Sequence, residues 1–218
     1  SVFIYGLIKF CRAQPYPWIA FTAAIPYLLI VVAMGYSRQG VALGIILLAL
    51  SNLNKDGTYR YIFLIIIAAL FHKTAIVMLF LSFFVNKKNL FTNLFIFVLI
   101  IFFAWEFILS DKFIPLYRDY IVQQMKSTGS YLRIILNIIS ATILLFYQKE
   151  WNDNFNDYNY WFWIAIITII SIGFIQFAST AVDRIGIYFI PLQLVVFSRL
   201  PILARKNFKP NFIKISII

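Results

Sequence analysis

Apolar residues form long uninterrupted runs that are separated by short polar stretches. The longest runs cover residues 18–34, 61–85, 90–109, 132–147, 160–182 and 185–200, and a shorter one covers 41–50. About 20 apolar residues span a bilayer as a helix, and none of the runs shows the alternation of a strand. The pattern predicts an all-α, polytopic transmembrane helical bundle with about seven membrane segments.

The composition leads to the same fold class. Of the 218 residues, 62% are hydrophobic and 12% are charged, whereas soluble domains carry about 45–50% apolar and about 25% charged residues. We find no repeat and no linker, so we expect a single transmembrane domain over residues 1–218. The chain opens and closes within apolar segments, and we therefore expect a fragment that lacks at least one helix on each side. Cys11 has no second cysteine with which to form a disulfide.

The net charge of +11 comes from positive residues between the apolar runs. At these places they orient a membrane protein, and they do not indicate binding of nucleic acid. The last polar connection carries the largest set, so we expect it in the cytoplasm: Arg199, Arg205, Lys206, Lys209 and Lys214. Counting back from there, the Asp183–Arg184 pair forms an extracytoplasmic turn, and residues 111–130 form a long extracytoplasmic loop.

The run at residues 61–85 allows two topologies. If it crosses the membrane once, His72 and Lys73 lie near the bilayer centre, where a charge is costly. If it breaks at His72 and returns, each half has only about 12 residues, or roughly 18 Å of helix. We prefer the broken segment, because it gathers four other cations on the cytoplasmic side: Lys9, Arg12, Lys55 and Arg60.

In the broken topology, several charged residues meet at the extracytoplasmic side: Arg38, His72, Arg118, Arg133, Asp183 and Arg184. Cations at membrane depth usually face a cavity or a partner, so we expect a basic, hydrated pocket. Arginine binds phosphate oxygens through two parallel hydrogen bonds, which makes a lipid-linked pyrophosphate a fitting ligand.

Five residues are predicted to bind substrate: Gln39, Lys73, Arg118, Arg133 and Tyr188. Each charged position also has a simpler interpretation. Arg38 reaches the headgroups from a helix end, Asp183 and Arg184 form a local ion pair, Arg118 and Arg133 contact headgroups, and His72 is a core histidine. Tyrosine and tryptophan near segment ends, including Tyr61, Tyr160 and Trp161, are expected in the interfacial belts. One histidine and scattered carboxylates indicate no metal site, and we expect no cofactor.

Three motifs, taken in order, resemble the EpsG branch of the Wzy-type polysaccharide polymerases. They are Gly-Tyr-Ser-Arg-Gln-Gly-Val-Ala at 35–42, Ala-Leu-Phe-His-Lys-Thr-Ala-Ile at 69–76 and Asp-Arg-Ile-Gly-Ile-Tyr-Phe at 183–189. The resemblance covers residues 35–200 and assigns Arg38, His72 and Arg184 to the family's motif positions. The sequence departs from the family in one respect, because it has no earlier Arg…Gly-x-Asp motif.

The resemblance implies a glycosyltransferase that polymerises undecaprenyl-pyrophosphate-linked oligosaccharide repeat units for capsule, O-antigen or exopolysaccharide. For this reaction we assign Arg38 and Arg184 as pyrophosphate clamps, and either His72 or Asp183 as the general base. The resemblance also implies a multi-pass protein of the bacterial plasma membrane with its active site on the extracytoplasmic side. The implied partners are the lipid-linked oligosaccharide, membrane lipids, and a chain-length regulator and flippase of the same pathway. A flippase or other transporter, a non-catalytic subunit of a synthase, and a ligase or acyltransferase for surface glycans remain alternatives.

Overall fold

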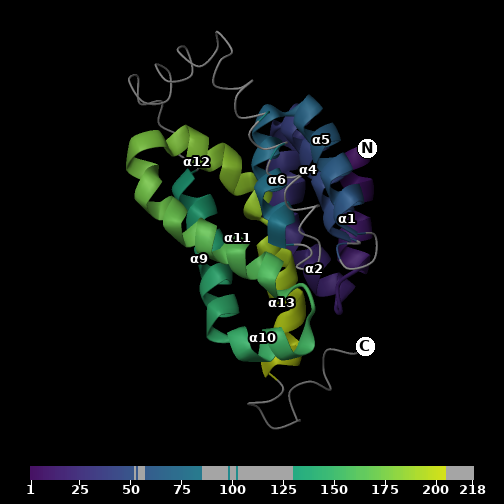
Figure 1. Ribbon diagram of the computed structural model, residues 1–218, viewed down its shortest axis with the longest axis vertical. Coiled ribbons are helices and arrows are strands. Elements are labelled where there is room, and N and C mark those ends of the chain that lie inside the picture. The colour runs from purple at the N-terminus through teal and green to yellow at the C-terminus, as the bar shows by residue number, and fades with distance from the viewer. Residues whose placement is uncertain (52, 54–56, 85–97, 99–101, 103–129, 205–218) are drawn as a thin grey trace.

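The computed structural model describes residues 1–51, 53, 57–84, 98, 102 and 130–204, and these residues form helices and short connections without a strand (Figure 1). The predicted all-α fold class is confirmed for this part of the chain. Three predicted features lie outside the described residues, apart from Val98, Phe102 and Ser130: the run at 90–109, the loop at 111–130 with Arg118, and the basic segment at 205–218.

The first apolar run forms one continuous helix from Pro17 to Gly35, built from α2 (Pro17–Ala24), the π-helical turn η1 (Ile25–Val32) and α3 (Ala33–Gly35). Among the described helices it alone is long and apolar enough to cross a bilayer unaided, and only 22% of its most apolar window is buried. A second candidate is the pair Ser179–Phe189 and Pro191–Ala204, bent by 41°. The number of about seven spans therefore stays a prediction.

Two glycines allow helices α1 and α4 to cross with their backbones in close contact. Gly6 of α1 (Val2–Arg12) faces Gly44 of α4 (Ser37–Ser51), and a methyl group on Gly6 would overlap the Gly44 carbonyl. A methyl group on Gly44 would stand 2.5 Å from the Cα atom of Phe3. Helices in membranes use small residues in this way, because close backbone contact replaces the hydrophobic effect as the source of attraction.

The predicted break at His72 is confirmed. Helix α5 (Gly57–Phe71) ends there, His72 is extended with φ −147° and ψ 111°, and the chain continues as η2 (Lys73–Ile76), α6 (Val77–Phe80) and η3 (Leu81–Phe84). The Tyr61 hydroxyl donates a hydrogen bond of 2.8 Å to the Met78 carbonyl. In one straight helix these two residues would stand about 26 Å apart, so α6 must run back along α5.

The prediction of one segment over 160–182 is wrong. Helix α11 (Tyr158–Ile170) ends in the turn η5 (Ser171–Phe174), and α12 (Ile175–Phe189) then begins. Figure 1 shows the chain changing direction between α11 and α12. Asp183 and Arg184 therefore lie inside α12 and not in a turn between two spans. The actual turn has no charge to mark it, and Gly173 was its one sequence signal.

A proline and two buried amides shape the bend between α12 and α13 (Pro191–Ala204). Pro191 has no N–H, so the helix cannot continue its hydrogen bonds unchanged, and the Ile190 N–H bonds the Ile187 carbonyl instead. Asn137 of α9 (Ser130–Phe146) donates to the Gly186 carbonyl at 2.9 Å and accepts from Gln193 at 2.6 Å. The two amides thus tie α9 to both sides of the bend.

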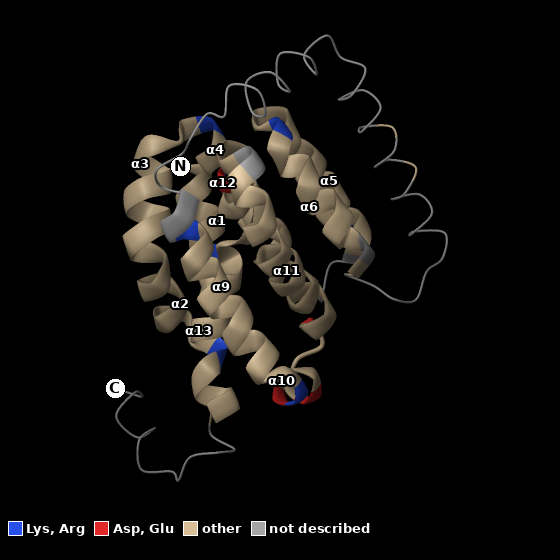
Figure 2. Cartoon of the chain, turned by 90° about the vertical axis from the view of Figure 1, so that its left-hand side faces the viewer, with Lys and Arg blue, Asp and Glu red and all other residues tan. Residues whose placement is uncertain are grey.

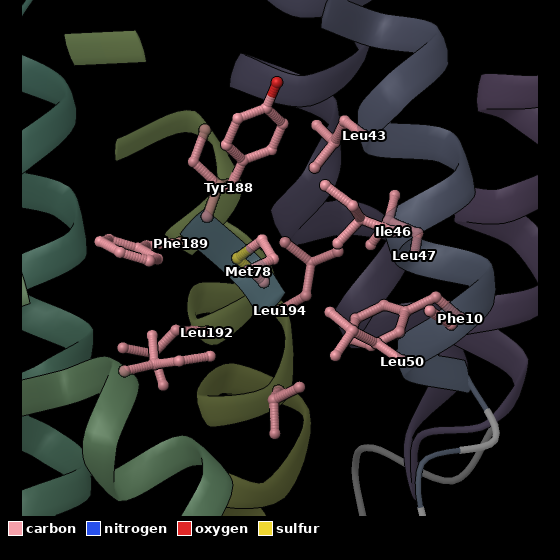
Figure 3. Packing of buried hydrophobic residues seen from close by; sticks show 14 of the residues in the cluster. Phe10, Leu43, Ile46, Leu47, Leu50, Met78, Tyr188, Phe189, Leu192 and Leu194 are labelled. Atoms are coloured by element: carbon pink, nitrogen blue, oxygen red, sulfur yellow. The ribbon is translucent and has the colours of Figure 1, made fainter. Parts of the chain in front are cut away.

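Most buried apolar residues of the described part form one continuous core. Figure 3 shows its centre, where Leu43, Ile46 and Leu47 of α4 face Met78 of α6 and residues of α12 and α13. The prediction that Tyr61, Tyr160 and Trp161 lie in interfacial belts is wrong, because all three are at most 2% exposed. Their polar atoms have partners inside the protein: the two tyrosine hydroxyls stand 2.9 Å apart, and the indole N–H of Trp161 donates to Asp157.

Candidate functional site

Three of the predicted site residues, Gln39, His72 and Arg133, contact residues 183–188 of α12. This stretch contacts α9, the first turn of α4 and the break after α5, which are far apart in the sequence. Each contact uses a side chain or carbonyl of one of the three motifs.

The first partner is the tight turn between α3 and α4. A single residue, Tyr36 with φ −128° and ψ 69°, separates the two helices. Two neighbouring residues in the first turn of α4 then face different surroundings. Gln39 is 3% exposed, and its Nε2 atom donates a hydrogen bond of 2.8 Å to the Arg184 carbonyl, whereas Arg38 is exposed. Gln39 therefore fixes α4 against α12, and the Arg38 cation stays at the surface beside that contact.

The second partner is the break at His72. The backbone of His72 is held on both sides: its N–H donates to Ala68 at 3.0 Å, and its carbonyl accepts from Ala75 at 2.9 Å. The Nδ1 atom of the half-buried ring lies 2.7 Å from the Thr74 hydroxyl and 2.9 Å from the Tyr188 hydroxyl. Thr74 was not among the predicted site residues, because its role depends on the local fold of η2.

Tyr188 connects the break to the other two segments. Thr74 and Gln39 also lie close enough to the Tyr188 hydroxyl to interact with it. The ring is fully buried, and in Figure 3 it lies beside Leu43 with the hydroxyl pointing away from the other labelled apolar side chains. Apolar packing therefore fixes the ring, and the hydroxyl is delivered to a polar cluster. We call this group, formed by Gln39, His72, Thr74 and Tyr188, the polar cluster.

Three exposed cations stand directly beside the polar cluster. Arg38 precedes Gln39, Lys73 follows His72, and Arg184 lies four residues before Tyr188, on the same face of α12. Arg184 is also close enough for its charge to act on His72. Figure 2 shows Lys and Arg at the upper ends of α4 and α5, above helices that are otherwise mainly uncharged. The arrangement produces a basic surface around a hydrogen-bonded histidine.

The third partner is Arg133 of α9, which is 2% exposed. Its Nη1 atom lies 2.5 Å from the Asp183 carboxylate and donates to the Asp183 carbonyl at 2.9 Å. The guanidinium also lies 4.8 Å from the ring centre of Tyr27 and 5.9 Å from that of Tyr36. Contact with lipid headgroups is therefore wrong for Arg133, and Asp183 forms a buried ion pair with α9. This pair, called the site pair below, anchors α12 from inside.

A second buried pair lies away from the predicted site, between α11 and α13. Both oxygens of Asp157 accept from Arg199, at 2.6 and 2.7 Å, and Gln14 accepts from the same guanidinium at 3.4 Å. Arg199 is 6% exposed and lies within α13, so its assignment to a polar connection is wrong. Acid and base stand 42 residues apart, and no sequence pattern indicates their pairing. We call it the closed pair.

The family relationship of this protein extends over the whole chain. Residues 1–218 match the model of the EpsG family. The chain belongs to the EpsG family. The resemblance drawn from the three motifs is thereby confirmed, and the family is associated with Wzy-type polysaccharide polymerases. No curated protein and no solved structure matches the chain.

Membership of the EpsG family makes the chain a membrane protein of polysaccharide biosynthesis. At the level of the family it points to a polymerase of the glycosyltransferase type. The three motifs that carried the resemblance are also the three segments that meet at the polar cluster. Within the described residues, no group of three or more histidine, cysteine or acidic side chains is placed to hold a metal ion.

Proposed function

We propose that this EpsG protein joins undecaprenyl-pyrophosphate-linked oligosaccharide repeat units on the extracytoplasmic side of the bacterial plasma membrane. One observation carries the proposal beyond family membership. Side chains of the three motifs bond one another across up to 145 residues of sequence, through Gln39 with the Arg184 carbonyl and His72 with Tyr188. Cations that only anchor helix ends to lipid headgroups would not require hydrogen bonds between the three motifs.

The chemistry suits the residues that surround the cluster. A sugar hydroxyl of one repeat unit attacks the anomeric carbon of another, and a pyrophosphate leaves. That leaving group needs neutralisation of its charge, which preorganised cations supply. Arg38 and Arg184 are exposed and stand beside the cluster. We assign them as the pyrophosphate clamps, with Lys73 as a third cation.

The two candidates for the general base differ in their surroundings. Asp183 is 5% exposed and is paired with Arg133, so its carboxylate is occupied within the protein. His72 is half-buried at a break in the helix, next to the exposed Lys73. We therefore favour His72 as the base, and we assign Arg133, Asp183 and Gln39 to holding α12 and α4 in place. The membrane, a flippase and a chain-length regulator are the proposed partners.

The test replaces Arg38 or Arg184 by alanine in the full-length protein, in cells whose native copy has been deleted. We expect long polymer to disappear and single lipid-linked repeats to accumulate, because the charge of the leaving group is no longer neutralised. Arg12→Ala is the matched control, since Arg12 is an exposed arginine near the end of α1. It should give polymer of normal length.

Two outcomes would contradict the proposal. Polymer of normal length in both Arg38→Ala and Arg184→Ala would show that these arginines are not pyrophosphate clamps. It would favour a non-catalytic subunit of a synthase. Purified protein in vesicles that moves lipid-linked repeats across the bilayer without forming a glycosidic bond would instead indicate a flippase.

A further inference from the structure

The two ring nitrogens of His72 stand in different surroundings. Nδ1 has two hydroxyl partners, Thr74 at 2.7 Å and Tyr188 at 2.9 Å. Nε2 has no hydrogen-bond partner within the part of the chain that the structure describes, although the ring is only half-buried. A histidine that is held through one nitrogen presents the other to a ligand in a fixed direction.

Both hydroxyls are themselves fixed in place. Thr74 lies two residues after His72, in a turn that the Ala75 N–H to His72 carbonyl bond closes at 2.9 Å. Tyr188 comes from α12, where its ring is fully buried beside Leu43. One hydroxyl therefore belongs to the same short turn as the histidine, and the other belongs to the helix that carries Arg184. The charged described residues next to the ring are Arg184 and Lys73.

We propose that Thr74 and Tyr188 are positioning residues that hold Nδ1 of His72 and turn Nε2 toward the acceptor sugar, whose hydroxyl proton it removes. This inference rests on the proposed function, because it assigns a role within the same reaction. His72 is the catalytic residue, and the two hydroxyls act through it.

In the reaction the neutral imidazole keeps its proton on Nδ1, and this N–H donates a hydrogen bond to a hydroxyl oxygen. The lone pair of Nε2 takes the proton of the acceptor hydroxyl as that oxygen forms a bond to the anomeric carbon. The bond from the anomeric carbon to the pyrophosphate oxygen breaks, and its electron pair leaves with undecaprenyl pyrophosphate. The proton on Nε2 then passes to water, which restores the neutral ring.

The experiment uses purified full-length protein in vesicles of bacterial lipid, supplied with lipid-linked repeat units, and measures kcat and KM for polymer formation. His72→Gln keeps an N–H group near Nε2 but has no basic nitrogen. We expect it to lose at least about 100-fold in kcat, as His72→Ala does, because a general base contributes about 10²–10⁴-fold. A His72→Gln protein with nearly normal kcat would overturn the proposal, since a donor alone would then suffice.

The positioning roles are tested by removing one hydroxyl at a time. Thr74→Val and Tyr188→Phe should each lower kcat about tenfold with KM little changed, as expected for one lost hydrogen bond. Thr74→Ser should restore the activity, because it returns the hydroxyl. Thr168→Val and Tyr61→Phe are matched controls, since both lose a buried, hydrogen-bonded hydroxyl in α11 or α5, and their kcat should not change.

Normal kcat in both Thr74→Val and Tyr188→Phe would overturn the positioning roles while leaving the proposed function intact. Equal losses in the site variants and the controls would also overturn them, because the effect would then be general to buried hydroxyls. If one variant fails to fold, the other carries the test. If the wild-type protein forms no polymer under these conditions, the proposed function itself falls, and this inference falls with it.

Discussion

The two buried arginine–aspartate pairs have similar chemistry and different settings. The site pair, Arg133 with Asp183, joins α9 to α12, and the closed pair, Arg199 with Asp157, joins α13 to the start of α11. In Figures 1 and 2, α12 lies toward one end of the molecule, and α10 (Gln148–Asn154) and the end of α13 lie toward the other. The residues around each pair show its role: one pair only stabilises the fold, and the other also supports a functional site.

The closed pair is enclosed by the protein. Its guanidinium makes two bonds to one carboxylate, and it lies 4.2 Å from the ring centre of Phe155 and 5.3 Å from that of Trp151. The second carboxylate oxygen also accepts from the indole of Trp161 at 2.9 Å. Arg199, the cation of this group, is itself buried. We therefore interpret the pair as a contact that holds the ends of α1, α11 and α13 together.

The site pair leaves its neighbours accessible. Asp183 is buried, but the next residue, Arg184, is exposed, and the Arg184 carbonyl receives Gln39. Arg133 bonds both the carboxylate and the carbonyl of Asp183, so it fixes the backbone of α12 as well as a side chain. A buried pair of this kind sets the position of the exposed cation that follows it in α12.

The largest effect on stability should come from Asp157→Ala. The change leaves Arg199 buried without its carboxylate, and breaking such a pair destabilises a protein by about 3–5 kcal/mol. Unfolding of the purified protein in detergent measures the loss. The double variant Asp157→Leu/Arg199→Met should recover most of it, because no charge is then left uncompensated. Unchanged stability in Asp157→Ala would show that the closed pair does not hold these helices together.

The double variant Arg133→Met/Asp183→Leu makes the matching change at the site pair. We expect a stability within about 2 kcal/mol of the wild type, for the same reason of removing both charges. Polymer formation should nevertheless fall about tenfold or more, because the Asp183 carbonyl loses the hydrogen bond that fixes α12. The Asp157→Leu/Arg199→Met protein should polymerise normally. Equal polymer formation in the two double variants would contradict the claim that only the site pair supports activity.

The glutamines offer a smaller and closely matched comparison. Gln39→Leu and Gln14→Leu each remove one buried amide, and each should cost about 0.5–1.5 kcal/mol of stability. Because Gln39 bonds the Arg184 carbonyl and Gln14 belongs to the closed pair, only Gln39→Leu should reduce polymer formation. Reduced polymer formation in both variants, measured at matched protein levels in membranes, would contradict the separation.

The smallest effects are expected at two exposed lysines. Lys73→Ala and Lys149→Ala should both change stability by less than about 0.5 kcal/mol, since neither removes a buried contact. Lys73 stands beside His72 and Lys149 lies in α10, at the other end of the molecule. We therefore expect KM for the lipid-linked repeat to rise in Lys73→Ala alone. A rise of the same size in Lys149→Ala would point to a general effect of surface charge.

Some of this arrangement could be predicted from the sequence. His72 and Lys73 interrupt an apolar run, and a charge at the bilayer centre is costly. Together with the gathering of four other cations on one side of the membrane, this cost predicts the break that the Tyr61–Met78 bond confirms. The helix from Pro17 to Gly35 followed from its uninterrupted apolar run. Both features are local, and local patterns of hydrophobicity carry them.

Other parts depend on contacts that no local pattern records. The turn at Ser171–Phe174 lies within apolar sequence, so the sequence predicts a turn at the charged pair of residues 183–184 instead. The partners of Asp183 and Asp157 are 50 and 42 residues away, and only the packing of the helices determines them. The sequence does not predict the role of Thr74 for the same reason. That role depends on the contact between its hydroxyl and the ring of His72.

Side-specific thiol labelling tests the central claim that the three exposed cations share one extracytoplasmic site. Cys11, which is buried, is first replaced by alanine, and single cysteines are then introduced as Arg38→Cys, Lys73→Cys, Arg184→Cys and Lys149→Cys. A maleimide that cannot cross the membrane should label positions 38, 73 and 184 in intact cells, and position 149 only after the membrane is opened. Labelling of positions 38 and 184 from opposite sides of the membrane would contradict the account.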